Sequence, residues 1–377
     1  MSKTLQDYAT LINDTIQSNE INHYITTDNM CQNLGGIDTF KNINIPQGKV
    51  RSFQKDDVLL SNIRLYFRKV YRAKQKGGCS SDVLVFRAKH IDSATLFAIL
   101  SSQIFTDYAC SGSQGSKMPR GNKTHMMDFK IPTINFTIAK IFNSIQNKIE
   151  NNHKINELLH KILELLYEQY FVRFDFLDEN NKPYQTSGGK MKFSKELNRL
   201  IPSGWSVRFL NHKIVSTYQP KTISKTLLND SYSYSVYGGG GIIGRFTEYN
   251  HEQSEFIISC RGQCGISYLT LPKSWITGNA MVIRPTKSYT SKTYLYHTIK
   301  KYKLTNYITG SVQPQITRQN LSTMPILIPK RKTLNKWNNT SSLLWNLIHN
   351  NMQSIQTLTA LRDFLLPLLL TQQVKPQ

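Results

Sequence analysis

The sequence predicts an α+β protein: two α/β domains in a tandem, pseudo-two-fold repeat, separated by two long antiparallel helices that form a coiled coil. Three observations lead to this prediction. The chain falls into register with itself after a shift of 198 residues, each copy opens with short strand-like runs, and each copy ends in a long helical pattern. At about 100–200 residues per domain, the 377 residues leave room for two or three domains.

The repeat is visible as matched residues at a constant offset of 198. The matched pairs are Val58–Ser61 with Phe256–Ser259, residues 83–85 with 281–283, Arg120 with Arg318, and Asn122 with Asn320. With one residue of slip, the Ile-Pro dipeptide at 131–132 also falls on the Ile-Pro at 328–329. We therefore expect a duplication of about 198 residues. Arg120 and Arg318 are both candidate DNA contacts, and the alternative is a shared structural role near the exit of each domain.

The first part of each copy has the pattern of a mixed α/β segment. Residues 83–86, Phe256–Ser259 and 280–283 are short apolar runs, and Gly, Asn and Ser separate them from their neighbours. Such runs predict strands. We expect one α/β domain at residues 1–131 and the second at residues 179–329.

A long helical pattern follows each Ile-Pro dipeptide, at residues 132–178 and 330–377. Apolar side chains recur there mostly every three or four residues, which is typical of one helix face, and neither stretch contains Gly. A helix of about 40 residues would be about 60 Å long. The positions expected to form the coiled coil or to bind a partner are Ile145, Ile149, Ile155, Leu159, Ile162 and Leu166, and then Ile348, Met352, Ile355, Leu358, Leu361 and Leu365.

Helices of this length must bury their apolar face lengthwise, and each is the obvious partner of the other. The alternative is two separate core helices in larger bundles. Asparagine pairs at 151–152 and 350–351 interrupt the two patterns at similar places. These residues fix the register, open space for a partner, or are simply exposed.

The charge of the chain is strongly positive and unevenly placed. The chain has 47 Lys and Arg against 24 Asp and Glu, a formal net charge of +23. The 107 residues between Glu255 and Asp363 contain 14 Lys or Arg and no carboxylate, and residues 62–78 form a second acid-free basic stretch. Such surfaces suit phosphate neutralisation, so we expect nucleic acid ahead of an anionic membrane. The alternative is a solvated basic face.

Membrane insertion and disulfide bonding are not expected. The longest apolar run, at 364–370, has seven residues and includes Pro367, far short of the ~20 needed to span a bilayer. The N-terminus lacks the apolar segment of a secretion signal. The five cysteines are scattered and odd in number, so we expect a reducing cytoplasm.

Five motifs, in order along the chain, resemble the specificity subunit of type I restriction–modification enzymes. They are Pro-Ser-Gly-Trp at 202–205, a Gly-rich turn at 238–241 with Gly244, Ile-Ile-Ser-Cys-Arg-Gly at 257–262, a segment from Gln-Ile-Thr at 315–317 to Ile-Pro at 328–329, and a Leu-Arg ending at 361–369. The first half lacks the opening motif and the Gly-rich turn. The resemblance implies target recognition domains at 1–131 and 179–329, with long helices at 132–178 and 330–377.

What the resemblance implies is a scaffold that performs no chemistry. Such a subunit reads a bipartite DNA target and holds two adenine-methylating modification subunits along its helices, as part of phage defence. A restriction subunit joins some of these complexes. The methyl donor S-adenosylmethionine, and ATP with Mg²⁺ where a restriction subunit is present, would belong to those partners.

Candidate DNA contacts fall into two classes. Phosphate contacts are expected from Arg64, Arg68, Lys69, Arg72, Lys273, Lys300 and Lys301. Family-like loops carry the candidates for base readout, Arg261, Gln263, Gln313, Gln315 and Arg318, because Arg pairs with guanine and Gln with adenine. Each of them could instead contact phosphate or water. Gly239 and Gly240 would let a backbone approach a phosphate beside Arg245, or would form a flexible hairpin tip.

Catalytic motifs are absent from the sequence. There is no Asp/Asn-Pro-Pro-Tyr/Phe tetrapeptide to hold a flipped adenine and no Gly-x4-Gly-Lys-Ser/Thr loop for ATP. Cys260 and Cys264 have no second Cys/His pair nearby, so we expect no metal site. The alternatives are a recognition subunit of another methylation-based phage-defence system, a stand-alone DNA-modifying enzyme, and a coiled-coil structural protein with incidental charge.

Overall fold

The computed structural model describes residues 3–38, 41, 43–131, 134–229, 232–262, 264–310 and 313–371, and the side chains of these residues up to 368. The chain divides into two compact units. Unit 1 comprises Met1–Ile155 with Asn351–Gln377, and unit 2 comprises Asn156–Asn350. Each unit contains β-sheets, short helices and part of both long helices, which confirms the α+β class.

The main sheet of unit 1 is antiparallel and is buried on both faces. Its strands, in spatial order, are β1 (Ala9–Ile12), β8 (Val83–Ala88), β5 (Val58–Ser61) and β6 (Val70–Arg72). Val58, Leu60, Leu84 and Phe86 belong to one core, and Leu59, Val83 and Val85 to another. Burial on both faces explains why these strands are continuous apolar runs and do not alternate.

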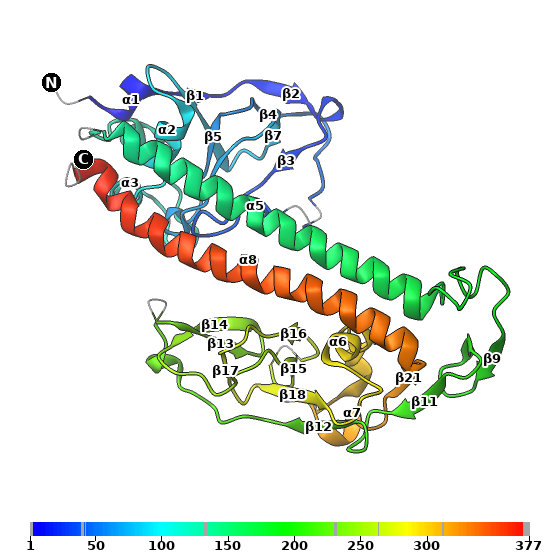
Figure 1. Ribbon diagram of the computed structural model, residues 1–377. Coiled ribbons are helices and arrows are strands. Elements are labelled where there is room, and N and C mark those ends of the chain that lie inside the picture. Colours follow the sequence, from blue (N-terminus) through cyan, green and yellow to red (C-terminus); the bar gives the residue numbers. More distant parts are fainter. Residues whose placement is uncertain are drawn as a thin grey trace. The chain divides into compact units, whose positions relative to one another are not determined.

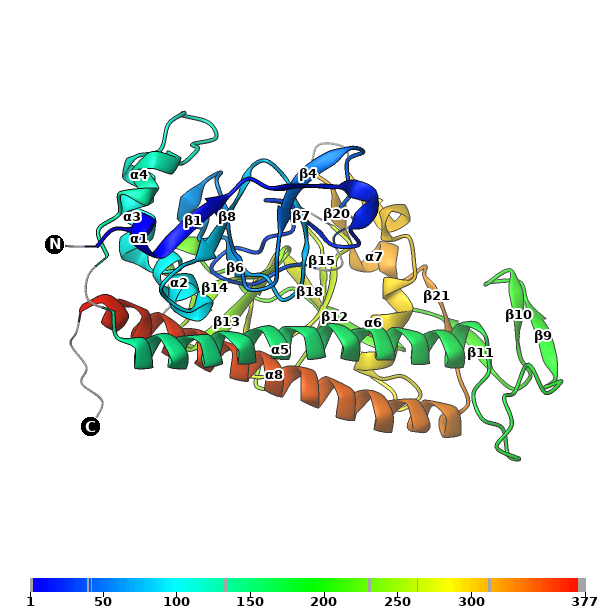
Figure 2. The ribbon, with the colours of Figure 1, turned by 90° about the horizontal axis from the view of Figure 1, so that it is seen from above.

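A second sheet in unit 1 has the order β2-β4-β7-β3, with bounds Thr15–Gln17, Lys49–Phe53, Gly77–Cys79 and Tyr24–Ile25. A Cβ on Gly77 would lie 2.6 Å from the backbone oxygen of His23, so only glycine fits there. Four short helices gather near the N-terminal end of α5 (Figures 1 and 2): α1 (Leu5–Tyr8), α2 (Ser93–Leu100), α3 (Gln103–Ser111) and α4 (Lys123–Met127).

Unit 2 repeats this plan. Its main sheet has the order β12-β18-β15-β16, with bounds Val215–Tyr218, Ala280–Pro285, Phe256–Ser259 and Ser267–Leu269. Its second sheet has the order β14-β13-β17, with bounds Gly241–Phe246, Tyr234–Gly238 and Trp275–Ile276. The predicted strands at 83–86, Phe256–Ser259 and 280–283 are therefore confirmed.

The remaining elements of unit 2 lie around these sheets. Helices α6 (Lys292–Lys300) and α7 (Arg318–Leu321) follow β18, and β11 (Ser206–Phe209) pairs with β21 (Pro325–Ile328). Strands β19 (Ile308–Thr309) and β20 (Gln315–Ile316) form a small hairpin. The hairpin of β9 (Met191–Ser194) and β10 (Arg199–Pro202) stands beyond the C-terminal end of α5 (Figure 2).

The repeat extends to individual backbone hydrogen bonds. Ile63 bridges Arg120 in unit 1, and Arg261 bridges Gln315 in the same way in unit 2. Two hydrogen bonds beside each bridge also match. The bond from Asn62 N to Asp82 O (2.8 Å) corresponds to the bond from Cys260 N to Asn279 O (3.0 Å). The bond from Gly121 N to Asn62 O (3.2 Å) corresponds to the bond from Ile316 N to Cys260 O (3.1 Å). Arg120 therefore corresponds to Gln315.

This register corrects part of the sequence alignment. The pairings of Arg120 with Arg318 and of Asn122 with Asn320 are wrong, and so is the shared role inferred from them. Asn122 caps α4, whereas Thr317 is the residue that caps α7. The chain between the bridging residues is three residues shorter in unit 2, so the offset drops from 198 to 195 across this segment.

The two long helices are α5 (Phe136–Tyr167), continued by a π-helical turn through Val172, and α8 (Arg331–Thr371). Phe174, with φ of 58°, ends the first helix before residue 178. In each unit, residue numbers rise along α5 as they fall along α8 (Figure 1), which confirms antiparallel pairing. The pairs are Gln146 with Arg362 and Asn152 with Ser354 in unit 1, and Asn156 with Ile348 and Tyr167 with Trp337 in unit 2.

Some predicted positions between the helices are wrong. Ile145, Ile149 and Ile348 are buried, and Leu159, Leu166, Met352, Ile355, Leu358 and Leu365 are half-buried. Ile155, Ile162 and Leu361 are 43%, 44% and 44% exposed. The step from Ile149 to Ile155 is six residues, a rotation of about 240° around the helix axis, which leaves the buried face. The buried face of α5 continues instead through Asn152, Asn156, Leu163 and Tyr167.

Candidate nucleic-acid interface

Two predicted base readers of unit 2 lie side by side at the end of β15. Arg261 is the second residue after that strand and forms an isolated antiparallel bridge with Gln315 in β20. The bridge is continued by the hydrogen bond from Ile316 N to Cys260 O, 3.1 Å. Both side chains are exposed, so their donors and acceptors face solvent.

The Gly-rich hairpin tip lies against the same place. A Cβ on Gly239 would lie 2.9 Å from Ser259 Oγ and 3.0 Å from Arg261 O, so the close approach requires glycine. A Cβ on Gly240 would meet no heavy atom of the described residues within 4 Å. The hairpin between β13 and β14 therefore brings an open backbone tip next to Arg261.

Asn279 completes this cluster and was missed by the sequence reasoning. Its backbone carbonyl accepts the hydrogen bond from Cys260 N, and the residue is exposed. Its position in the turn after Gly278 and before an apolar run is the signal that could have found it. We call Gly239, Gly240, Arg261, Asn279 and Gln315 the loop end of unit 2. Gln313 is exposed in the turn before Gln315, and Gln263 lies outside the described residues.

The other predicted cations of unit 2 already have protein partners or lie elsewhere. Arg245 donates hydrogen bonds to the carbonyl oxygens of Tyr232 and Ser233. Three lysines form ion pairs: Lys273 with Glu252 (4.0 Å), Lys300 with Glu164 (2.6 Å) and Lys301 with Glu168 (3.3 Å). Arg318 lines a shallow pocket with Asn211 and His212, at the start of α7. Arg245 therefore supports its own hairpin, and its expected contact with phosphate stays a prediction.

The basic stretch at 62–78 mostly supports the fold of unit 1. Arg68 donates a 2.8 Å hydrogen bond to Ser101 O, and Lys69 donates a 2.6 Å bond to Thr27 O. Burial lowers the pKa of both side chains. Arg72 is mostly buried and lies 3.6 Å from Asp56. Backbone carbonyls and a carboxylate therefore hold these three cations in unit 1, and their expected contacts with phosphate stay a prediction.

Arg64 and Arg120 remain at the loop end of unit 1. Arg120 bridges both Ile63 and Gln114, and its Nη2 lies 3.0 Å from Asp82 Oδ1. Arg64 directly follows Ile63, and its backbone N–H donates to Pro119 O (2.9 Å). The side chain of Arg120 is 60% exposed. We call Ile63, Arg64, Asp82, Gln114 and Arg120 the loop end of unit 1.

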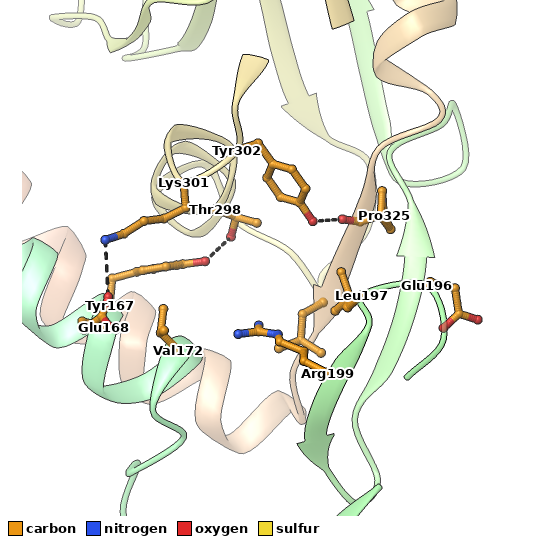
Figure 3. Close-up of a pocket in the computed structure, with 11 residues that line it drawn as sticks. Tyr167, Glu168, Val172, Glu196, Leu197, Arg199, Thr298, Lys301, Tyr302 and Pro325 are labelled. Carbon is orange, nitrogen blue, oxygen red and sulfur yellow. Dashed lines mark hydrogen bonds and ion pairs between the residues drawn. The ribbon is translucent and has the colours of Figure 1, made fainter. Parts of the chain in front are cut away.

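A pocket of about 380 Å³ in unit 2 is lined by polar side chains that form hydrogen bonds or ion pairs with other groups of the protein (Figure 3). Tyr167 Oη donates to Thr298 Oγ1 (3.1 Å), Lys301 pairs with Glu168, and Tyr302 Oη donates to Pro325 O. Burial raises the pKa of Tyr302 to about 12, so its hydroxyl stays protonated. These interactions stabilise the fold of unit 2 and do not indicate a ligand site.

No group of three or more His, Cys, Asp or Glu side chains that could hold a metal ion occurs among the described residues. Cys260 Sγ accepts a hydrogen bond from Gln219 Nε2 (2.9 Å), and Cys264 Sγ lies 3.1 Å from Pro314 O. Burial raises the pKa of both thiols, which disfavours the thiolate form that binds metals. Within the described ranges, no helix is both long and apolar enough to cross a bilayer.

Comparison with known proteins shows which proteins this chain resembles. Residues 202–336 match the family model described as the type I restriction modification DNA specificity domain. This confirms the resemblance carried by the five motifs.

Two of the similar proteins are a specificity subunit and a solved S subunit. Over 310 residues the chain is 22% identical to the MjaIX type I restriction enzyme specificity subunit of Methanocaldococcus jannaschii, a match that covers 72% of this chain and 67% of that protein. The crystal structure of the S subunit of a type I restriction-modification system from M. genitalium has the same fold. It is 14% identical, with a TM-score of 0.63 over 98% of this chain and 96% of that one.

Proposed function

We propose that this chain reads a bipartite DNA target, with one half-site read by the loop end of each unit. One observation carries the proposal: the two loop ends share a backbone framework and differ in the side chains that it presents. Ile63, Asp82 and Arg120 in unit 1 stand where Arg261, Asn279 and Gln315 stand in unit 2. One scaffold with two sets of donors and acceptors is what two different half-sites require.

The side chains at the loop ends have suitable chemistry for base edges. An arginine presents two donors to the O6 and N7 of guanine, and a glutamine matches the N6 and N7 of adenine. The open backbone at Gly240 leaves room for a phosphate to approach. The absence of carboxylates between Glu255 and Asp363 favours binding to a polyanion.

The long helices would hold modification subunits. In unit 2, Leu158, Ile162 and Leu165 are 44–54% exposed, and their steps of four and three place them on one face of α5. Exposed apolar side chains in such a row mark protein contacts. We propose that two adenine-methylating subunits pack against the helices here. S-adenosylmethionine would then belong to those subunits, and ATP with Mg²⁺ to any restriction subunit.

Sequencing of methylated adenines in host DNA tests this function. With the gene and its modification partner present, methylation should occur at interrupted, adenine-containing sites, and deletion of the gene should remove it. The purified chain should also bind its target with an affinity that falls steeply as salt rises. The proposal fails if the methylation pattern is unchanged by the deletion, or if the chain alone modifies DNA with S-adenosylmethionine or Mg²⁺.

A further inference from the structure

We infer that Arg120, positioned by Asp82, reads a guanine in the half-site of unit 1. This inference rests on the proposed function and extends it to a base that the alignment of motifs could not assign. The first half of the chain lacks the family's opening motif and Gly-rich turn. The assignment comes instead from comparing the backbone hydrogen bonds within unit 1 with those within unit 2.

The register identifies Arg120 as the counterpart of Gln315. Each residue makes two antiparallel backbone pairings, one on each side. Arg120 pairs with Ile63 and with Gln114, and Gln315 pairs with Arg261 and with Thr309. A glycine with φ near 90° opens the turn in both cases, Gly115 (φ 99°) and Gly310 (φ 88°). The backbone thus presents the two side chains from equivalent positions.

The carboxylate beside Arg120 also has a counterpart. Asp82 and Asn279 precede β8 and β18, and each carbonyl accepts the matching hydrogen bond from the main sheet. Unit 1 therefore has an acid and an arginine at the two framework positions where unit 2 has Asn279 and Gln315. In unit 1 the two side chains form an ion pair.

An acid at a DNA-facing loop needs a reason, because it repels the phosphate backbone. Asp82 Oδ1 lies 3.0 Å from Arg120 Nη2, and the arginine side chain is 60% exposed. An exposed pair of this kind contributes little to folding stability. It does hold one edge of the guanidinium and leaves further N–H donors free, as two-point recognition of guanine O6 and N7 requires.

A phosphate contact by Arg120 is the competing role, and the two roles predict different mutant behaviour. Loss of a base contact relaxes specificity at one position, whereas loss of a phosphate contact weakens all sequences alike and lowers the salt slope by about one. The experiment therefore measures binding of the chain, in complex with its modification subunits, to the methylated target identified in the host and to each single-base variant of it.

R120Q and R120K should lose discrimination for guanine at one position by about 5- to 150-fold, with the salt slope unchanged. D82N should lose less and still prefer guanine. The reciprocal Q315R should gain a guanine preference in the other half-site. K123Q, which removes an exposed charge from α4 in the same unit, is the matched control and should leave every base preference unchanged.

Two results separate failure of this inference from failure of the proposed function. If the wild-type complex marks no interrupted sequence, the proposed function falls and the inference with it. If it marks one but R120Q weakens all sequences equally, or the responding half-site holds no guanine, only the inference is overturned. Circular dichroism melting confirms that each variant is folded.

Discussion

Arg87 donates two hydrogen bonds of 2.8 Å to the carboxylate of Asp57, through Nε and Nη2. The carboxylate is only 2% exposed and also accepts a bond from Gln54 N. Unit 2 contains a similar pair, in which Arg284 donates through Nε (3.1 Å) and Nη2 (2.7 Å) to Oε1 of Glu255. The pair is thus a repeated structural element that anchors the start of the central strand to its neighbour in each unit.

Loss of one partner of this pair should destabilise unit 1. R87M leaves the carboxylate of Asp57 buried without its arginine, and the free energy of unfolding should fall by about 1–3 kcal/mol. Urea unfolding followed by circular dichroism measures the change. The double variant D57N/R87M should lose less than the sum of the two single variants. Additive losses would show that the two side chains do not interact.

Arg362 is a buried charge in α8 that ties both helices to a loop of unit 1. The side chain is 1% exposed, and it donates to Gln146 Oε1 (3.0 Å) and Asn33 O (3.2 Å). R362M should destabilise the protein by about 1–3 kcal/mol, because both acceptors lose their donor. R331M, at an exposed position of the same helix, is the control and should change stability by less than about 0.5 kcal/mol.

The corrected face of α5 can be tested with two neighbouring residues. I162K should leave the free energy of unfolding within about 0.5 kcal/mol of wild type and abolish association with the modification subunits, because Ile162 is exposed. L163K places a charge at a fully buried site and should destabilise unit 2 by about 3–5 kcal/mol. A pull-down assay with the modification subunits measures association, and urea unfolding measures the stability of both variants. Equal destabilisation would contradict the observed face.

Acid should destabilise unit 2 through His297. This histidine is buried among Tyr167, Tyr296 and Trp337, and burial lowers its pKa to about 3. Between pH 6.5 and about 3 the unfolded chain binds this proton and the folded chain does not. Stability is therefore retained above pH 6.5 and falls as the pH drops, by up to about 1.4 kcal/mol per pH unit for this group.

Urea unfolding of wild type and H297Q at pH 7, 6 and 5 measures this dependence. H297Q should show a shallower loss of stability on acidification, although His349, whose pKa burial lowers to about 4, retains its own share. H212Q removes an exposed histidine and should follow wild type. Parallel curves for wild type and H297Q would contradict the account.

The sequence predicted the parts of the fold that follow from long-range periodicity. The duplication, the strands at Val58–Ser61 and Phe256–Ser259, and the two antiparallel helices all come from apolar patterns that repeat over many residues. A pattern of this kind survives small insertions. Arg120 and Gln315 could not be matched in this way, because three residues are lost in the intervening loops and only the hydrogen-bond register restores the alignment.

Side-chain roles were harder to predict, because they depend on carbonyl groups that a sequence does not show. Arg68 and Lys69 are bound by Ser101 O and Thr27 O, each more than 30 residues away. Asn152 and Asn156 lie on the buried face of α5 because each finds a partner on α8. Apolar periodicity placed Ile155 on that face, but the Ile155 side chain is exposed in the structure.

The measurement that tests the central claim most directly is the adenine methylome of cells that express wild type, R120Q or Q315A with the same modification subunits. Wild type should mark one interrupted sequence. R120Q should alter the bases accepted in one half of that sequence, and Q315A those in the other half. If both variants alter the same half, or if neither alters any base, the two loop ends do not read separate halves of the target.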